Sequence, residues 1–189
     1  MTIKTEKIFR DRQFSIAISN PSAWLFEAGH LKKAADRICW LDQGHQEIED
    51  PDFDFSFLYP IYRMLIGFSF ENLLKGILLA QDAIFMENGE IGKTFTTHNI
   101  GHLLSQINDS QFKLTSEEKK ILIELEKYVV WQGRYPVPKK KERYKLSVHS
   151  TPEHLIEQEL WKKINDYLID SIAKSISKKL GNNHNNKNV

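Results

Sequence analysis

The chain is poor in cysteine and lacks the glycine-rich loops that bind nucleotide phosphates. Cys39 is the only cysteine among 189 residues, which excludes an internal disulfide framework and a cysteine-rich zinc site. The sequence contains no phosphate-loop motif, no dinucleotide-binding motif and no Gly-x-Ser-x-Gly nucleophile turn. ATP-driven phosphoryl transfer and hydride transfer therefore have little support, and we predict neither a cofactor nor a metal.

A long uncharged hydrophobic run is also missing. The most apolar window, residues 61–83, is interrupted by Arg63, Glu71, Lys75 and Asp82. Charges at these intervals argue against a membrane span. The first residues, MTIKTEKIFRDRQF, are polar and charged, unlike a signal peptide. We therefore predict a cytoplasmic protein that does not interact with a membrane.

The formal net charge of +1 hides an asymmetry between the two parts of the chain. Residues 1–110 carry 10 Lys and Arg against 15 Asp and Glu, whereas residues 111–189 carry 16 against 10. The second part is therefore suited to attract phosphates. The alternative is that the two parts pack together and their charges partly cancel.

Apolar residues recur at helical spacing along almost the whole chain, which predicts an all-α fold. The expected helices span residues 20–44, 58–86, 98–107, 115–131 and 151–181. Short connections favour an up-and-down antiparallel bundle of about five helices. We predict a single domain over residues 1–181, ended by Gly181, and a disordered Asn-rich tail over residues 182–189.

The helix predicted over residues 58–86 is apolar nearly all round and is expected at the centre of the bundle. Its polar exceptions, Arg63, Glu71 and Lys75, share one stripe. Glu71 and Lys75 are spaced i, i+4, which favours a structural ion pair, with a direct chemical role as the alternative. His98 begins the next helix, and we interpret Thr97 or His98 as its cap rather than as part of a metal site.

The segment 132–150 lies between two predicted helices and is strongly basic. It reads QGRYPVPKKKERYKLSVHS. Five residues separate Arg143 from His149. A guanidinium and an imidazole held close together are suited to phosphodiester chemistry. The alternative interpretation is a solvated connection without chemistry.

The order of three motifs resembles that of HEPN domains, the nucleotide-binding helical domains of higher eukaryotes and prokaryotes. Glu71-Asn-Leu-Leu-Lys75 is similar to the Glu-x-x-x-Lys of their second helix. His98-Asn99-Ile100 is similar to their His-Asp-Leu segment, with Asn in place of Asp. Gly133-Arg134-Tyr135-Pro136 looks like the Arg-Tyr-Pro signature that precedes their last helix. The order and spacing fit over about residues 20–180.

The resemblance implies a four- or five-helix bundle, commonly paired as a homodimer. In its catalytic branch it implies metal-independent RNA cleavage by an Arg-x(4–6)-His motif at a cleft between two subunits, in toxins and defence nucleases. Here Arg134 has no histidine at that spacing. Arg143 and His149 satisfy the spacing but follow the Arg-Tyr-Pro turn, and Tyr144 stands where the family often has Asn.

The first functional hypothesis is therefore an endoribonuclease of toxin or defence type. His149 would move the proton, and Arg143 or Arg134 would stabilise charge on the phosphorus centre. Backbone phosphates would be held by Lys139, Lys140, Lys141 and Lys145. Bases would stack on Tyr135 and Tyr144. Arg63, Glu71, Lys75 and His98 would support the site from the bundle.

The second hypothesis is a non-catalytic HEPN-like module. The basic segment 132–150 would then bind a nucleotide phosphate or the acidic surface of a protein, such as a nucleotidyltransferase or an antitoxin. The polar stripe on the central helix would be structural. The third hypothesis is a structural or regulatory helical protein whose basic segment is only a solvated surface.

Overall fold

Helix α3, Tyr59–Ala80, is the central element of the computed structural model. It is buried nearly all round, as its apolar sequence predicts. The structure describes residues 19–42, 58–83, 86–87, 90–132 and 151–185, and every structural statement below refers to these residues. Neighbouring helices contact α3 on several sides, so the hydrophobic core forms around it.

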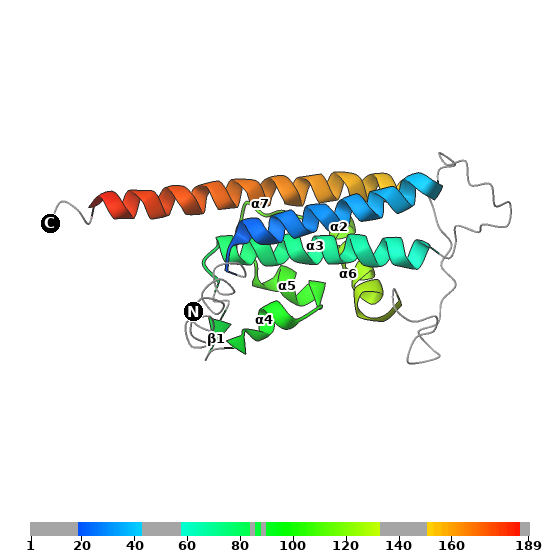
Figure 1. Cartoon of the computed structure of the whole chain (residues 1–189), viewed down its shortest axis with the longest axis horizontal. Coiled ribbons are helices and arrows are strands. Elements are labelled where there is room, and N and C mark those ends of the chain that lie inside the picture. Colours follow the sequence, from blue (N-terminus) through cyan, green and yellow to red (C-terminus); the bar gives the residue numbers. More distant parts are fainter. Residues whose placement is uncertain (1–18, 43–57, 84–85, 88–89, 133–150, 186–189) are drawn as a thin grey trace, which may run out of the picture.

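Two long helices run beside α3 (Figure 1). Helix α2, Pro21–Asp42, is antiparallel to α3, and helix α7, Thr151–Asn185, runs in the same direction as α3. Shorter elements lie on the other side of α3: helices α4, Lys93–Thr96, α5, Ile100–Gln106, and α6, Ser116–Lys127, with a π-helical turn at Tyr128–Gln132. The predicted all-α helical bundle is confirmed.

Strand structure in the described residues is limited to one short pair. Strands β1, Met86–Glu87, and β2, Glu90–Ile91, pair antiparallel, with Met86 opposite Ile91. None of the described helices combines the length and the apolar content that crossing a membrane requires.

Local signals placed several helix starts correctly. Helix α2 begins at Pro21, where a proline lacks only an N–H that has no partner inside the helix. Helix α6 begins after Thr115, whose hydroxyl accepts from the backbone N–H of Glu118 at 3.1 Å. The Glu118 carboxylate in turn accepts from the N–H of Thr115 at 2.6 Å, which completes the predicted capping box.

The predicted end of the central helix near Met86 is wrong, because α3 ends at Ala80. Asp82 adopts a left-handed backbone with φ of 62°. The N–H of Ala83 then donates to the carbonyl of Leu78 at 3.0 Å, and the N–H of Asp82 donates to Leu79 at 3.1 Å. These two bonds form a Schellman ending with aspartate in the position that glycine usually takes. The apolar run beyond it misled the prediction.

Two further helix ends differ from the prediction. Asn99, rather than Thr97 or His98, caps α5, because its side chain accepts from the N–H of His102 at 2.6 Å. Helix α7 passes through Gly181 and ends at Asn185. Glycine inside a helix costs only about 1 kcal/mol relative to alanine, so it need not end one. The predicted tail is therefore helical at its start.

Two glycines on α3 allow its neighbours to approach closely. A Cβ at Gly67 would lie 2.6 Å from Val129 Cγ2 and 3.3 Å from the Leu125 carbonyl oxygen. A Cβ at Gly76 would lie 2.8 Å from Leu168 Cδ2. Gly67 thus allows α6 and the π-helical turn to pack closely on α3, and Gly76 allows the same for α7.

Candidate functional site

The predicted binding and catalytic residues of the basic segment lie outside the described residues. They are Arg134, Tyr135, Lys139, Lys140, Lys141, Arg143, Tyr144, Lys145 and His149. The two described flanks of this segment are the π-helical turn that ends at Gln132 and helix α7, which begins at Thr151. Near the same end of the bundle, α2 ends and α3 begins (Figure 1).

A buried ion pair joins α3 to α7 at this end. The Arg63 guanidinium and the Glu157 carboxylate are in contact, and the two residues are only 4% and 1% exposed. The Tyr62 hydroxyl donates to Glu157 Oε2 at 2.6 Å. The guanidinium also lies 5.7 Å from the Tyr59 ring centroid and 5.4 Å from that of Tyr128. Arg63 therefore contacts both the π-helical turn and α7.

The charges of this pair are reinforced by its surroundings. Burial alone would lower the pKa of Arg63, but the adjacent Glu157 carboxylate raises it above its usual value. Burial, followed by the charge of Glu157 and the hydrogen bond to it, raises the pKa of the Tyr62 phenol far above its usual range. Tyr62 therefore keeps its proton and stays a hydrogen-bond donor to Glu157.

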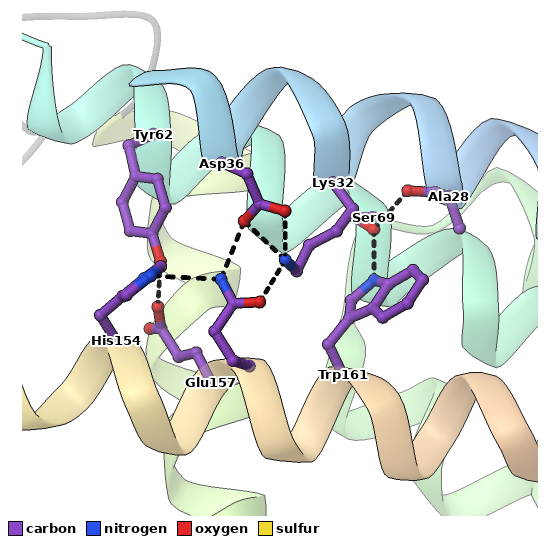
Figure 2. Close-up of polar contacts among 9 residues, drawn as sticks. Ala28, Lys32, Asp36, Tyr62, Ser69, His154, Glu157 and Trp161 are labelled. Atoms are coloured by element: carbon purple, nitrogen blue, oxygen red, sulfur yellow. Dashed lines mark hydrogen bonds and ion pairs between the residues drawn. The ribbon is translucent and has the colours of Figure 1, made fainter. Parts of the chain in front are cut away.

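The hydrogen-bond network continues from Tyr62 across α7 to α2 (Figure 2). His154 Nδ1 lies 2.8 Å from the Tyr62 hydroxyl oxygen. Because that hydroxyl donates to Glu157, His154 must be the donor in this contact, so the proton of the neutral ring is on Nδ1. His154 Nε2 can then accept from the amide of Gln158 at 3.3 Å. The imidazole is thus held on both sides.

Gln158 links this network to a second ion pair, on α2. Its amide nitrogen donates to Asp36 Oδ1 at 2.8 Å, and its amide oxygen accepts from Lys32. Lys32 Nζ also donates to Asp36 Oδ2 at 2.6 Å and lies 5.5 Å from the Trp161 ring centroid. Lys32 is only 6% exposed, so Asp36 supplies the opposite charge that its burial requires.

Trp161 and Ser69 continue the polar contacts toward the centre of the bundle (Figure 2). The indole N–H of Trp161 donates to Ser69 Oγ at 2.7 Å. The hydroxyl of Ser69 then donates to the carbonyl of Ala28 at 2.6 Å. These bonds satisfy polar groups in the α2–α3–α7 interface and fix how the three helices pack.

His154 makes the stability of this end dependent on pH. Burial, the main cause, lowers the pKa of its imidazole below the ordinary 6.5, with Asp36 opposing that shift and Lys32 adding to it. The unfolded chain therefore binds the proton more tightly than the folded chain. The stabilisation is complete above pH 6.5 and is lost as pH falls through the lower folded pKa.

We expect the urea midpoint of the protein to fall between about pH 7 and pH 5.5 by more than that of His154→Gln, which removes this titration. Acidic groups titrate mainly below this window, because their ordinary pKa values lie near 4. His102→Gln, at an exposed position on α5, is the control and should keep the full pH dependence. Equal slopes for the protein and His154→Gln would contradict the prediction.

A second polar cluster lies further along α3, where two predicted motifs meet. Lys75 Nζ donates to Glu71 Oε1 at 2.6 Å, and both residues are buried. His98 Nδ1 lies 3.0 Å from Glu71 Oε2, although 27 residues separate the two along the chain. Lys75 Nζ also lies 5.6 Å from the Trp24 ring centroid. The predicted Glu71–Lys75 ion pair is therefore present, and His98 is its third member.

The predicted polar stripe thus divides into two separate sites. Arg63 binds Glu157 of α7, whereas Glu71 binds Lys75 and His98. Arg63 and Glu71 are eight positions apart on one helix, or about 12 Å at a rise of 1.5 Å per residue. Both clusters pair their buried charges, which supports the structural interpretation of the stripe.

Sequence reasoning missed most of the network at the end of the bundle. The missed residues are Lys32, Asp36, Tyr62, His154, Glu157 and Gln158. One signal was available, because Lys32 and Asp36 are spaced i, i+4 on a predicted helix. Tyr62 and His154 come from segments 92 residues apart, so only the packing of α3 against α7 brings them together.

Comparisons with protein-family models, with curated proteins and with solved structures found no match for this chain. Within the described residues, no group of three or more His, Cys, Asp or Glu side chains is arranged to hold a metal ion.

Proposed function

We propose that this chain is a HEPN-like helical protein that acts on RNA through the basic segment 132–150. One observation carries the proposal. Two of the three motifs that resemble the family, Glu71-x-x-x-Lys75 and the segment that begins at His98, contact each other through Glu71 and His98 at 3.0 Å. Motifs that match only by chance have no reason to meet in the folded chain, so this contact supports the resemblance.

The buried ion pair at the end of the bundle contacts both described flanks of the basic segment. Arg63 lies near the ring of Tyr128, four residues before Gln132, and contacts Glu157, six residues after Thr151. The Arg63 guanidinium on the central helix therefore contacts the described residues on both sides of the segment. Rigid flanks lower the entropy that the segment loses when it binds a ligand.

The charge of the segment suits a polyanion. Residues 132–150 contain six Lys or Arg side chains and one Glu. We propose that Lys139, Lys140, Lys141 and Lys145 hold backbone phosphates, while Tyr135 and Tyr144 stack on unpaired bases. Binding of single-stranded RNA should then weaken steeply as salt is added.

The proposed reaction uses the nucleophile that RNA itself supplies. His149 accepts the proton of a ribose 2′-hydroxyl, and the 2′-oxygen forms a bond to the adjacent phosphorus. The bond from phosphorus to the 5′-oxygen breaks, and that oxygen takes up the proton that His149 accepted. The products are a 2′,3′-cyclic phosphate and a 5′-hydroxyl. Arg143, or Arg134, stabilises the added negative charge by two hydrogen bonds.

We also propose a location, an oligomeric state and a class of partner for the protein. The resemblance implies a cytoplasmic toxin or defence nuclease that works as a homodimer. It also implies a possible protein partner of the antitoxin or nucleotidyltransferase class. These partners and this location belong to the proposal together with the RNA substrate.

The test is cleavage of a labelled single-stranded RNA in the presence of EDTA. We expect His149→Ala to lower the cleavage rate about 10²- to 10⁴-fold, the usual contribution of a general acid or base. Arg143→Gln should also lower it strongly. The matched control is His102→Ala, an exposed histidine on α5, which should leave the rate unchanged.

Two results would count against the nuclease. Unchanged cleavage by His149→Ala, with the helical content intact by circular dichroism, would overturn the role of His149. RNA binding without cleavage by the intact protein would instead favour the non-catalytic module. Replacing Lys139, Lys140 and Lys141 by alanine should then reduce the salt dependence of binding, with a slope smaller by about 2.

A further inference from the structure

The second half of α7 carries an apolar stripe on its outer face. The helix extends past the rest of the bundle at its C-terminal end (Figure 1). Along this part the stripe consists of Ile169, Ala173, Ile176 and Leu180. The three large side chains are 46%, 53% and 64% exposed in that order, and Ala173 is also exposed.

The opposite face of the same helical segment packs on the body of the protein. Leu168 is fully buried, and Ile172 packs against the core. Lys174 donates to Gln111 at 2.9 Å, and Lys178 donates to Asp82 at 3.0 Å. The body thus holds one face of α7, while the stripe faces away from it.

The spacing of the stripe is that of a coiled-coil seam. Its members follow each other at intervals of four, three and four residues, which is the alternation of d and a positions in a heptad. The next seam positions toward the N-terminus are Asp166 and Lys162, which form an exposed ion pair at 2.9 Å. The apolar seam is therefore confined to residues 169–180.

We propose that this stripe pairs with the same stripe of a second copy of the chain, as two antiparallel helices. A two-fold axis between residues 174 and 175 places Ile169 beside Leu180 of the second copy. The same axis places Ala173 beside Ile176 of the second copy. Each apolar seam is then covered along its whole length, because a two-fold interface requires a surface that complements itself.

The charges beside the stripe favour the antiparallel arrangement. Asp170 lies beside its N-terminal end and Lys179 beside its C-terminal end, whereas Asp166 pairs with Lys162 and Lys178 pairs with Asp82. Antiparallel pairing brings Asp170 of one copy to the level of Lys179 of the other, which attracts. Parallel pairing in register would instead set ends of like charge at the same level.

This pairing does not depend on the proposed RNA reaction, and it gives the homodimer of the proposed function a different interface. The start of α7 lies about 24 residues from the two-fold axis, so the two starts are roughly 70 Å apart at 1.5 Å per residue. Each copy would therefore carry its own RNA-directed end. This differs from the shared cleft that the resemblance implies.

The first experiment measures mass by sedimentation equilibrium of the full chain. We expect a dimer for the unmodified protein and at least a 100-fold weaker dimer for Ile176→Glu, because the substitution buries one unpaired carboxylate from each copy, two in all, at the centre of the seam. The matched control is Ile123→Glu on α6, since Ile123 is 50% exposed against 53% for Ile176. The control should remain dimeric.

A monomer at the highest soluble concentration of the unmodified protein would overturn the proposal. So would a dimer that Ile176→Glu leaves intact, because another surface would then hold the copies together. RNA cleavage by Ile176→Glu separates the two proposals. If the dimer is lost while cleavage persists, the pairing stands without a role in the reaction, and a failed RNA assay leaves the dimer measurement unaffected.

Disulfide cross-linking tests the direction of pairing. In a Cys39→Ser background, Ile169→Cys and Leu180→Cys proteins are mixed and oxidised. The antiparallel register predicts a cross-link between positions 169 and 180 of different copies and none between two 169 positions, which lie roughly 16 Å apart along the axis. Cross-links between identical positions would overturn the antiparallel register.

Discussion

Glu157→Ala is expected to lower the free energy of unfolding by about 3–5 kcal/mol, the usual cost of removing one member of a buried ion pair. The substitution leaves the Arg63 guanidinium, only 4% exposed, without that carboxylate. It also removes the acceptor of the Tyr62 hydroxyl. Urea denaturation followed by circular dichroism measures the change.

Two further variants distinguish the effect of losing the ion pair from the effect of substituting a glutamate in this part of α7. Glu159→Ala removes an exposed carboxylate two residues away on α7 and should change stability by less than about 0.5 kcal/mol. Arg63→Met combined with Glu157→Leu should recover part of the stability, because apolar side chains need no partner, while the Tyr62 hydroxyl still lacks its acceptor. A loss below about 1 kcal/mol in Glu157→Ala would show that water reaches Arg63 and that the pair is not desolvated.

Glu71→Ala is the second large expected effect, again about 3–5 kcal/mol of unfolding free energy. Lys75 is only 4% exposed and would lie near the Trp24 ring without the carboxylate that now accepts its hydrogen bond. Lys75→Met should cost less, because methionine fills similar space and Glu71 keeps its contact with His98. Thermal and urea denaturation of the two variants give the comparison.

The matched control for this pair is the exposed ion pair of Glu124 and Lys127 on α6. Its side chains are 50% and 55% exposed, so Glu124→Ala should cost no more than about 1 kcal/mol. If Glu71→Ala costs no more than Glu124→Ala, the central cluster contributes little to folding. A Lys75→Met variant less stable than Glu71→Ala would show that His98 does not compensate the carboxylate.

The helices were predictable where their signals are local. The capping box at Thr115 and Glu118 and the proline at position 21 involve residues within one turn of each other. The predictions of helix ends were wrong where the end of the helix depends on the backbone conformation. Asp82 takes a left-handed conformation, which residue type alone does not require, and Gly181 does not end α7 because glycine only weakens a helix.

The same division applies to the candidate site. Glu71 and Lys75 are one helical turn apart, so their spacing alone predicted the ion pair. Arg63 and Glu157 are 94 residues apart, and nothing near either residue indicates the other. The predicted catalytic pair, Arg143 and His149, lies outside the described residues and stays a prediction.

The sequence by itself determined the helical class, the central position of α3 and the charge of segment 132–150, because periodicity and composition are local properties of the chain. Only the tertiary structure decided which polar groups share a site. It joined Tyr62 of α3 to His154 of α7 and Glu71 to His98. The physical reason is that a buried polar group must find a partner, and the packing of the helices selects which one.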